Sequence, residues 1–311
     1  MDELTQSLDA FGPWDWACVG ANLFASFVGI TALKCWRNLP GKDTVSTISV
    51  TDAIMGICTG LLSFGIIFGV VTGMVAQSFT TFFGFSQAHL FTAAFSGQVA
   101  AACAMLGMAA LAPKTLDWAP SVETDEPKQE GSPLRQALRG FSIPRVLLGL
   151  LAIFALGFAA TLAWKGFHVA WEQLFLRGWT GQPPADEPQE IVDAVLKTDV
   201  DSWRFLTITL AVTVGAPIME ELAFRGMIYP GLRRLGAASE HHGRWVAIVL
   251  TGALFSAAHL SPSAALPLFA FGAFMCLVRD RYGLISCMAV HCSFNLWNLV
   301  WLKLAPNAST L

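Results

Sequence analysis

The chain has 311 residues, of which 54% are hydrophobic and 13% charged, and its mean hydropathy is +0.56. Soluble domains carry roughly 25% charged residues, so this composition excludes an ordinary soluble protein and indicates an integral membrane protein. The formal net charge is −3, and the basic residues are scattered along loops, which excludes nucleic acid as a partner. The seven cysteines form no CxxC pair, so we expect neither a zinc ribbon nor a disulfide framework.

Eight apolar runs approach the length of about 20 residues that a helix needs to cross a bilayer. They predict an all-α fold, a polytopic membrane helix bundle with about eight transmembrane helices. The sixth and seventh runs are short and are separated only by Ser261-Pro262-Ser263, so they equally fit one broken, buried helical hairpin. The runs are 16–34, 53–76, 88–112, 146–164, 204–229, 245–260, 264–279 and 284–304.

A change of composition divides the chain after the third run. Residues 113–133 are rich in Pro, Ser and acidic residues and have no apolar period, which predicts a cytoplasmic linker. We therefore predict a three-helix membrane unit at 1–112, a linker at 113–145 and a five-helix membrane core at 146–305. Five glycines predict close helix packing in the first unit: Gly56, Gly60, Gly65, Gly69 and Gly73.

A second polar break, 165–202, leads into a short amphipathic stretch. Between Gln189 and Lys197 the apolar residues would line one face of a helix. We predict that this helix rests on the membrane surface or caps the bundle.

The distribution of Lys and Arg predicts how the bundle is oriented, because cytoplasmic loops carry an excess of these residues. The loops after the first, third, fifth and seventh runs together hold 14 of the 19 basic residues. We predict that these four loops are cytoplasmic and that both termini lie outside.

Glu220 and Glu221 are the acidic residues that lie well inside a long apolar run, Thr207 to Tyr229. A charge at bilayer depth costs between about 3 and more than about 10 kcal/mol, so two adjacent carboxylates need a partner or a use. Glu221 and Arg225 are four residues apart on a helix, in the order that favours a charge pair. Glu220 is rotated away from that face and is a candidate general base.

Two histidines in later apolar runs extend this polar set. Phe255 and His259 share one helix face, and so do His291 and Asn295. An imidazole and a carboxamide one helical turn apart could hold a developing oxyanion, and a carboxylate with an imidazole could activate water. Spacing alone leaves three interpretations open, namely hydrolysis of an acyl bond, an ion or proton path, and a structural polar network.

Three four-residue-spaced motifs, which follow one another on successive apolar runs, resemble those of the CPBP family. That family contains CAAX prenyl endopeptidases and bacteriocin-processing or self-immunity membrane proteins, and is also called Abi. The likeness covers roughly residues 140–305 and does not extend to the first three runs. The motifs are Glu220-Glu221-x-x-x-Arg225, Phe255-x-x-x-His259 and His291-x-x-x-Asn295.

The resemblance implies an intramembrane endopeptidase whose catalytic core lies in the C-terminal half, at 146–305. In this interpretation Glu220 and His259 activate the attacking water, while His291 and Asn295 form the oxyanion site. The supporting residues are Glu221, Arg225 and Phe255.

Metal dependence is left open by the resemblance, because the family is described both as metal-dependent and as glutamate-dependent without metal. We expect no cofactor. The alternative is zinc, since one Glu with two His is also a catalytic zinc set. Its ligands would be Glu220, His259 and His291.

The implied substrate is a membrane-tethered peptide or protein, either prenylated or bacteriocin-like, within the lipid bilayer. The family type implies a multi-pass protein of the bacterial inner (plasma) membrane. Counting residues from the predicted span ends puts Glu220 and His259 at depths that differ by about 10 Å, and we expect the active site in the cytoplasmic half, open to the basic side. The alternative is a non-proteolytic immunity or scaffold protein that uses the same polar core for binding. The sequence predicts no oligomeric state.

Overall fold

The computed structural model confirms an all-α membrane bundle. It describes residues 42–43, 48–83, 87–112, 116, 122–123, 155, 157, 159–161, 163–164, 171, 195–200, 202–236 and 240–304. Within these residues the strands are β1 (Lys42–Asp43) and β2 (Val122–Glu123), which pair antiparallel. Five described helical spans are long and apolar enough to cross a membrane: Val50–Thr81, Leu90–Leu111, Trp203–Leu235, Pro262–Tyr282 and Leu284–Leu304.

Several predicted segments cannot be compared with the structure in full. The predicted run 16–34 lies outside the described residues, as do most of 146–164 and most of the linker 113–133. The predicted division into three units therefore stays a prediction.

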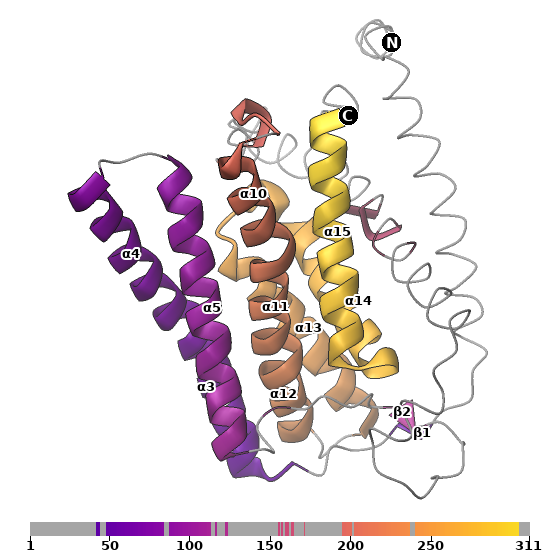
Figure 1. Cartoon of the computed structure of the whole chain (residues 1–311). Coiled ribbons are helices and arrows are strands. Elements are labelled where there is room, and N and C mark those ends of the chain that lie inside the picture. Colours follow the sequence, from indigo (N-terminus) through magenta and orange to yellow (C-terminus); the bar gives the residue numbers. More distant parts are fainter. Residues whose placement is uncertain are drawn as a thin grey trace, which may run out of the picture.

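The N-terminal helices form one long span and its return. The first span is α3 (Val50–Leu62), the π-helical segment η1 (Ser63–Ile67) and α4 (Phe68–Phe83). Ser49 caps its start, since its hydroxyl accepts a hydrogen bond from the Asp52 N–H at 3.1 Å. Helix α5 (Gln87–Leu111) then returns beside α4 (Figure 1).

The third described span holds the Glu-Glu pair and is interrupted twice by π-helical turns. Its segments are α10 (Trp203–Leu210), η4 (Ala211–Gly215), α11 (Ala216–Glu221), η5 (Leu222–Ile228) and α12 (Tyr229–Leu235). Pro217 and Pro230 come just after the two π segments. A proline removes one backbone donor and clashes with the carbonyl four residues earlier, and a wider turn accommodates both effects.

Helices α13 (Glu240–Ala258) and α14 (Ala265–Tyr282) form a tight hairpin. Its turn contains the 3₁₀ segment η6 (Pro262–Ala264). The two helices approach so closely that a Cβ on Gly272 would lie 3.0 Å from the Gly252 Cα. The predicted hairpin therefore forms, but α13 is not buried all round, because residues such as Trp245 and Val249 are exposed.

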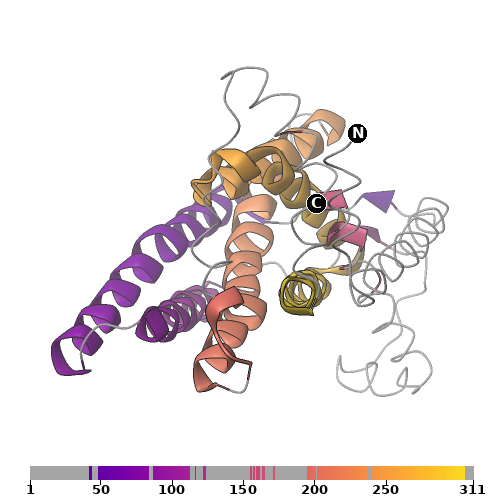
Figure 2. The same ribbon diagram turned by 90° about the horizontal axis from the view of Figure 1, so that it is seen from above.

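The last helix, α15 (Leu284–Leu304), lies directly against the Glu-Glu span. It follows a turn at Gly283, whose φ of 80° suits a glycine. Figures 1 and 2 both place the α10–α12 span between α5 and α15, with the α13–α14 hairpin behind it. Ala101 and Met105 of α5 share one buried apolar cluster with Met219 and Leu222. The N-terminal helices are thus packed directly on the segment that holds the glutamates.

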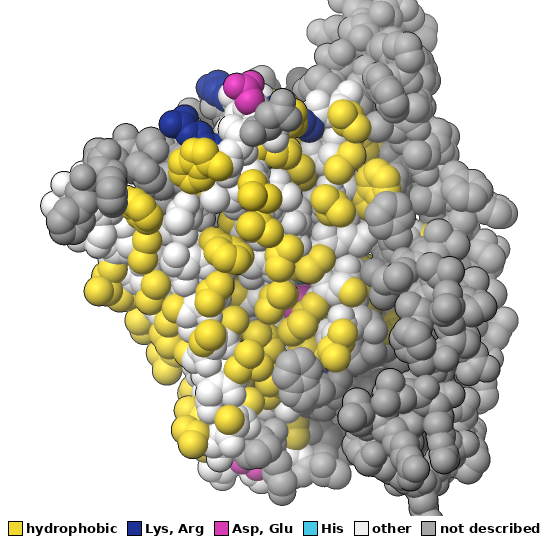
Figure 3. Space-filling model, in the orientation of Figure 1, with side chains coloured by type: hydrophobic (Ala, Val, Ile, Leu, Met, Phe, Trp, Pro, Cys, Tyr) yellow, Lys and Arg dark blue, Asp and Glu magenta, His cyan; other side chains and the backbone are white. Residues whose placement is uncertain are grey.

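The glycines of the first span differ in their packing. Gly60 meets the Glu-Glu span, since a Cβ there would lie 3.1 Å from both the Ala223 carbonyl oxygen and the Ile228 Cγ1. Gly65, Gly69 and Gly73 instead face open space. The predicted close packing is therefore right for Gly60 and wrong for these three. They lie on a span with a large exposed apolar surface (Figure 3).

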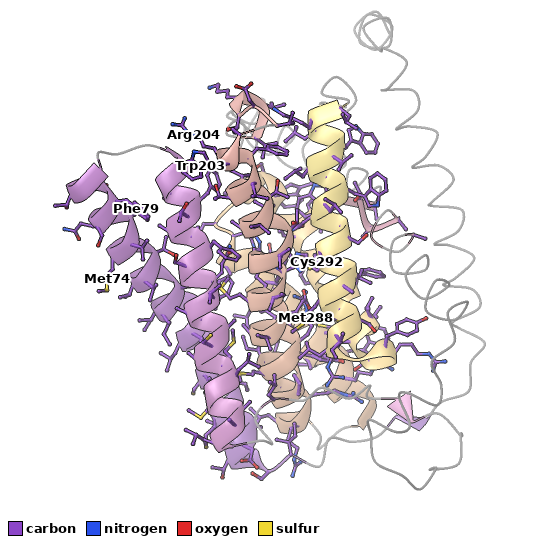
Figure 4. All side chains as sticks on the ribbon, viewed as in Figure 1. Met74, Phe79, Trp203, Arg204, Met288 and Cys292 are labelled. Carbon is purple, nitrogen blue, oxygen red and sulfur yellow. The ribbon has the colours of Figure 1, made fainter. Side chains whose placement is uncertain are left out.

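At the upper end of the bundle in Figure 1, the end of the predicted amphipathic helix packs against α10 and α15. Residues 195–197 are helical, and Val195 is buried against Ile208 and Leu299. The Lys303 ammonium donates to the carbonyl of Val195 at 3.0 Å, and also to those of Leu196 and Thr198. This part of the helix caps the bundle, one of the two predicted placements. Figure 4 shows Trp203 and Arg204 at the same end.

Candidate active site

Glu221 is the centre of the polar cluster. It is fully buried at the end of α11, and its Oε1 accepts hydrogen bonds from Arg225 Nη1 at 3.0 Å and His291 Nδ1 at 2.7 Å. The charge pair predicted from the four-residue spacing is therefore present. It also holds a histidine from α15, which the spacing alone did not predict.

Arg225 is fully buried in η5 and is compensated on several sides. Its Nη2 donates to the Gly272 carbonyl of α14 at 3.0 Å. Its guanidinium carbon lies 4.6 Å from the centroid of the Phe255 ring, within range of a cation–π interaction. A carboxylate, a carbonyl and an aromatic face together make burial of this cation tolerable. Arg225 thereby connects the Glu-Glu span to both helices of the hairpin.

Glu220 faces the other nitrogen of the same histidine. Its Oε2 lies 3.9 Å from His291 Nε2, and 11% of its side chain is exposed. Because Nδ1 of His291 donates to Glu221, it is Nε2 that faces Glu220. A separation of 3.9 Å is too long for a direct hydrogen bond but allows one water to contact both atoms. Figure 3 shows acidic atoms at mid-height of the apolar face, over the seam between α11 and α15.

His259 lies just beyond the end of α13 and is exposed. Its Nδ1 donates to the Phe255 carbonyl at 2.7 Å, which leaves Nε2 as the nitrogen for chemistry. The Phe255 ring lies 4.7 Å from the His259 ring and 6.2 Å from the His291 ring, measured between centroids. Phe255 is thus the spacer among both imidazoles and Arg225, which explains its place in the motif. The structure shows no direct contact of His259 with Glu220, so their joint role stays a prediction.

Asn295 lies one helical turn beyond His291 on α15 and is half-buried. Its Nδ2 donates to the Val212 carbonyl of η4 at 2.8 Å. This bond uses one of the two N–H groups of the amide. The predicted oxyanion pair of His291 and Asn295 stays a prediction. Figure 4 places Met288 and Cys292, their neighbours on α15, at the height of α11.

The alternative zinc set is not assembled among the described residues. There, no three His, Cys, Asp or Glu side chains gather closely enough to hold a metal ion. Glu220, His259 and His291 do not form a zinc site in this conformation, and the expected absence of a cofactor stays a prediction.

Several residues of the site could not be found from sequence. Phe271 packs edge-on against His291, with ring centroids 4.9 Å apart, and stacks on Phe294 at 4.4 Å. Gly272 and Val212 act through backbone carbonyls, for which residue type gives no signal.

One comparison with known proteins finds a family that matches the segment containing this site. Residues 202–297 match the family described as type II CAAX prenyl endopeptidase Rce1-like. This segment contains every residue of the three motifs, so the predicted resemblance is confirmed there. No curated protein and no solved structure matches the chain.

Proposed function

Because residues 202–297 match the family described as type II CAAX prenyl endopeptidase Rce1-like, we propose that this chain is an intramembrane endopeptidase. Its substrate is a peptide bond in a membrane-associated chain, prenylated or bacteriocin-like. It works in the inner (plasma) membrane of a bacterium, with its basic loops in the cytoplasm. The supporting observation is the 3.9 Å separation between Glu220 Oε2 and His291 Nε2, in a cluster whose other charges are paired.

The proposed chemistry is addition of water to the peptide carbonyl, with Glu220 as the base. As the water oxygen attacks the carbonyl carbon, Glu220 accepts one proton from it, aided by His259. The same proton then passes to the amide nitrogen as the C–N bond breaks, which yields a carboxyl and an amine. No cofactor takes part in this scheme.

The remaining polar groups serve the developing oxyanion and its support. His291, when protonated at Nε2, and the Asn295 amide donate to the carbonyl oxygen as it gains charge. Glu221 fixes the orientation of His291 through the 2.7 Å bond to Nδ1, and Arg225 balances the charge of Glu221. Glu221 and Arg225 are thus positioning residues.

The test is cleavage of membrane-tethered and farnesylated peptides by the full chain purified in detergent. We expect cleavage by the wild type, none by Glu220→Gln, and cleavage by the matched control Asp199→Asn, an exposed acid-to-amide change outside the Glu-Glu span. Each protein is assayed with and without a strong chelator. Survival of cleavage under chelation supports the glutamate mechanism, and loss that zinc restores overturns it.

A different result would favour the non-proteolytic alternative. If no peptide in the panel is cleaved, and Glu220→Gln retains the biological effect of the wild type in cells, the chain acts as an immunity or scaffold protein. In that case the polar core would serve binding alone.

A further inference from the structure

The path from the glutamates toward the basic loops is closed by packing. Every residue from Met219 to Gly231 is buried, which is the whole stretch from the glutamates to α12. Arg225 fills the space below Glu221, and its backbone carbonyl accepts from Arg279 Nε at 3.3 Å. Arg279 is itself fully buried. Buried side chains therefore separate the glutamates from the basic loops in the described part of the chain.

A second polar cluster completes this closure. Asp280 is buried, and its carboxylate accepts hydrogen bonds from the Tyr229 hydroxyl at 2.8 Å, Arg233 at 3.1 Å and Arg244 at 2.9 Å. The cluster joins α12, α13 and α14 where they meet the basic loops. Its polar groups satisfy one another, so it acts as a plug and not as a channel lining.

The opposite end of the site has exposed residues at the hairpin turn, where Trp171 Nε1 also donates to the Pro262 carbonyl at 2.8 Å. His259 is exposed there, and the adjacent Leu260 is 89% exposed with a φ of 50°, a left-handed conformation that is uncommon for leucine. Ser261 and Ser263 add polar groups to the same turn. On the facing helix Asn295 is only half-buried. The motif residues farthest from the basic loops are thus the accessible ones.

The length of α13 explains why the turn is recessed. Its apolar part, Gly243–Ala258, rises about 24 Å at 1.5 Å per residue, against a hydrocarbon core of about 30 Å. Helix α13 begins at the basic end, where Arg244 bonds Asp280. Counted from Gly243 as the cytoplasmic boundary, the end of α13 thus falls about 6 Å short of the far face of a core of that thickness. In Figure 1 the turn between α13 and α14 stops below the upper end of α15.

The number of Lys and Arg residues at each end of the bundle indicates which face of the membrane that end meets. The closed end has six basic residues among the described ones, and the open end has three. Cytoplasmic ends are the ones enriched in Lys and Arg. The six are Lys42, Arg233, Arg234, Arg244, Arg279 and Arg281, and the three are Lys197, Arg204 and Lys303.

We infer that substrate and water enter the site from the non-cytoplasmic face, through the hairpin turn at His259. This differs from the sequence prediction, which opened the site to the basic side. The inference rests on the proposed function for its substrate class, an anchored peptide whose cleaved bond lies just inside or above the outer leaflet. Of the two substrate classes proposed above, this entry side favours the bacteriocin-like peptide over a prenylated C-terminus in the cytoplasm.

Accessibility to a membrane-impermeant maleimide tests the direction of entry without any need for cleavage. In the full chain with its native cysteines replaced, one cysteine is introduced at a time by His259→Cys, Leu260→Cys, Asp199→Cys or Arg281→Cys. We expect the first three to be labelled from outside intact cells. Arg281→Cys, which marks the closed end, should be labelled only in inverted membrane vesicles.

The outcomes separate this inference from the proposed function. Labelling of His259→Cys and Leu260→Cys together with Arg281→Cys overturns the inference, and so does a His259→Cys that is labelled from neither side. If the cysteine-free chain does not fold, the native chain is assayed with an impermeant peptide added to intact cells or to inverted vesicles. Cleavage confined to the inverted vesicles contradicts the inference but leaves the protease assignment intact. Labelling from outside without cleavage of any peptide supports the direction of entry and contradicts the protease assignment.

Discussion

Three acidic side chains are buried among the described residues, and two of them, Asp280 near the basic loops and Glu220 at mid-depth, differ in how fully they are bonded. Asp280 accepts three hydrogen bonds through its two oxygens. Glu220 receives no direct hydrogen bond from the described residues, and His291 Nε2 lies 3.9 Å from its Oε2. A buried carboxylate that is saturated with donors adds stability, whereas one held without them is free to accept a proton.

The largest expected effect comes from removing the unsaturated carboxylate. Glu220→Gln keeps the size of the side chain but cannot accept a proton, so cleavage should fall by at least about 1,000-fold, within the range of general-base catalysis. The unfolding temperature in detergent should stay close to that of the wild type, because no direct hydrogen bond is lost. Both are measured on the same preparation. A variant that unfolds as well as losing activity would make Glu220 structural, like Asp280.

The next effect concerns the cation that balances the site. Arg225→Ala leaves Glu221 buried without its charge partner, which should cost about 3–5 kcal/mol of stability. Denaturant titration in mixed micelles measures this loss. Arg281→Ala is the matched control, because Arg281 lies half-buried at the end of α14, and a change there should stay within about 0.5 kcal/mol. Equal effects of the two variants would contradict the bonding described for Arg225.

A variant of Asn295 tests whether this amide donates to the oxyanion or only links α15 to the Glu-Glu span. If it stabilises the oxyanion, Asn295→Ala should lower kcat by about 100- to 1,000-fold and leave KM nearly unchanged. If it serves only to bind the Val212 carbonyl, stability should fall by about 1 kcal/mol with kcat unchanged. Asn298→Ala is the control, since that amide donates to the Phe294 carbonyl on the same helix. Steady-state kinetics on both variants decide between the two roles.

Asp280 should behave in the opposite way to Glu220. Asp280→Asn weakens three hydrogen bonds and leaves two arginines without a carboxylate, so we expect a loss of about 1–3 kcal/mol. The folded fraction should keep the kcat of the wild type. Asp52→Asn, at the exposed start of α3, is the control for the same chemical change. A large loss of kcat at constant folded fraction would mean that the plug also shapes the site.

The parts of this site that follow from side-chain spacing could be predicted, and those that depend on backbone or tertiary packing could not. The four-residue interval between Glu221 and Arg225 was enough for their pair, because helical geometry fixes it. The 2.7 Å contact from His291 joins residues 70 positions apart and requires the packing of α15 on α11. The carbonyls of Val212 and Gly272 give no sequence signal at all.

The depth of the histidines shows the same limit. Counting residues from the predicted span ends set Glu220 and His259 at different depths and in the cytoplasmic half. In the structure Glu220 is the eighteenth residue of a 33-residue span and α13 is short, so Glu220 lies near mid-depth and His259 follows the end of its helix. Only the packed hairpin, with Gly252 against Gly272, determines where α13 stops.

The smallest effect tests whether the N-terminal helices matter to the site. A Cβ on Gly60 would lie 3.1 Å from the carbonyl oxygen of Ala223, two residues beyond Glu221. Gly60→Ala should therefore displace η5, which should lower stability by about 1 kcal/mol and reduce kcat modestly. Gly69→Ala meets open space and should gain up to about 1 kcal/mol from helix propensity. The pair isolates packing from propensity, because both sites are glycines on the same span. If both variants gain stability and keep full kcat, the packing of α3 does not affect the site. If Gly60→Ala alone lowers stability and kcat, α3 supports the segment that positions Glu221 and Arg225.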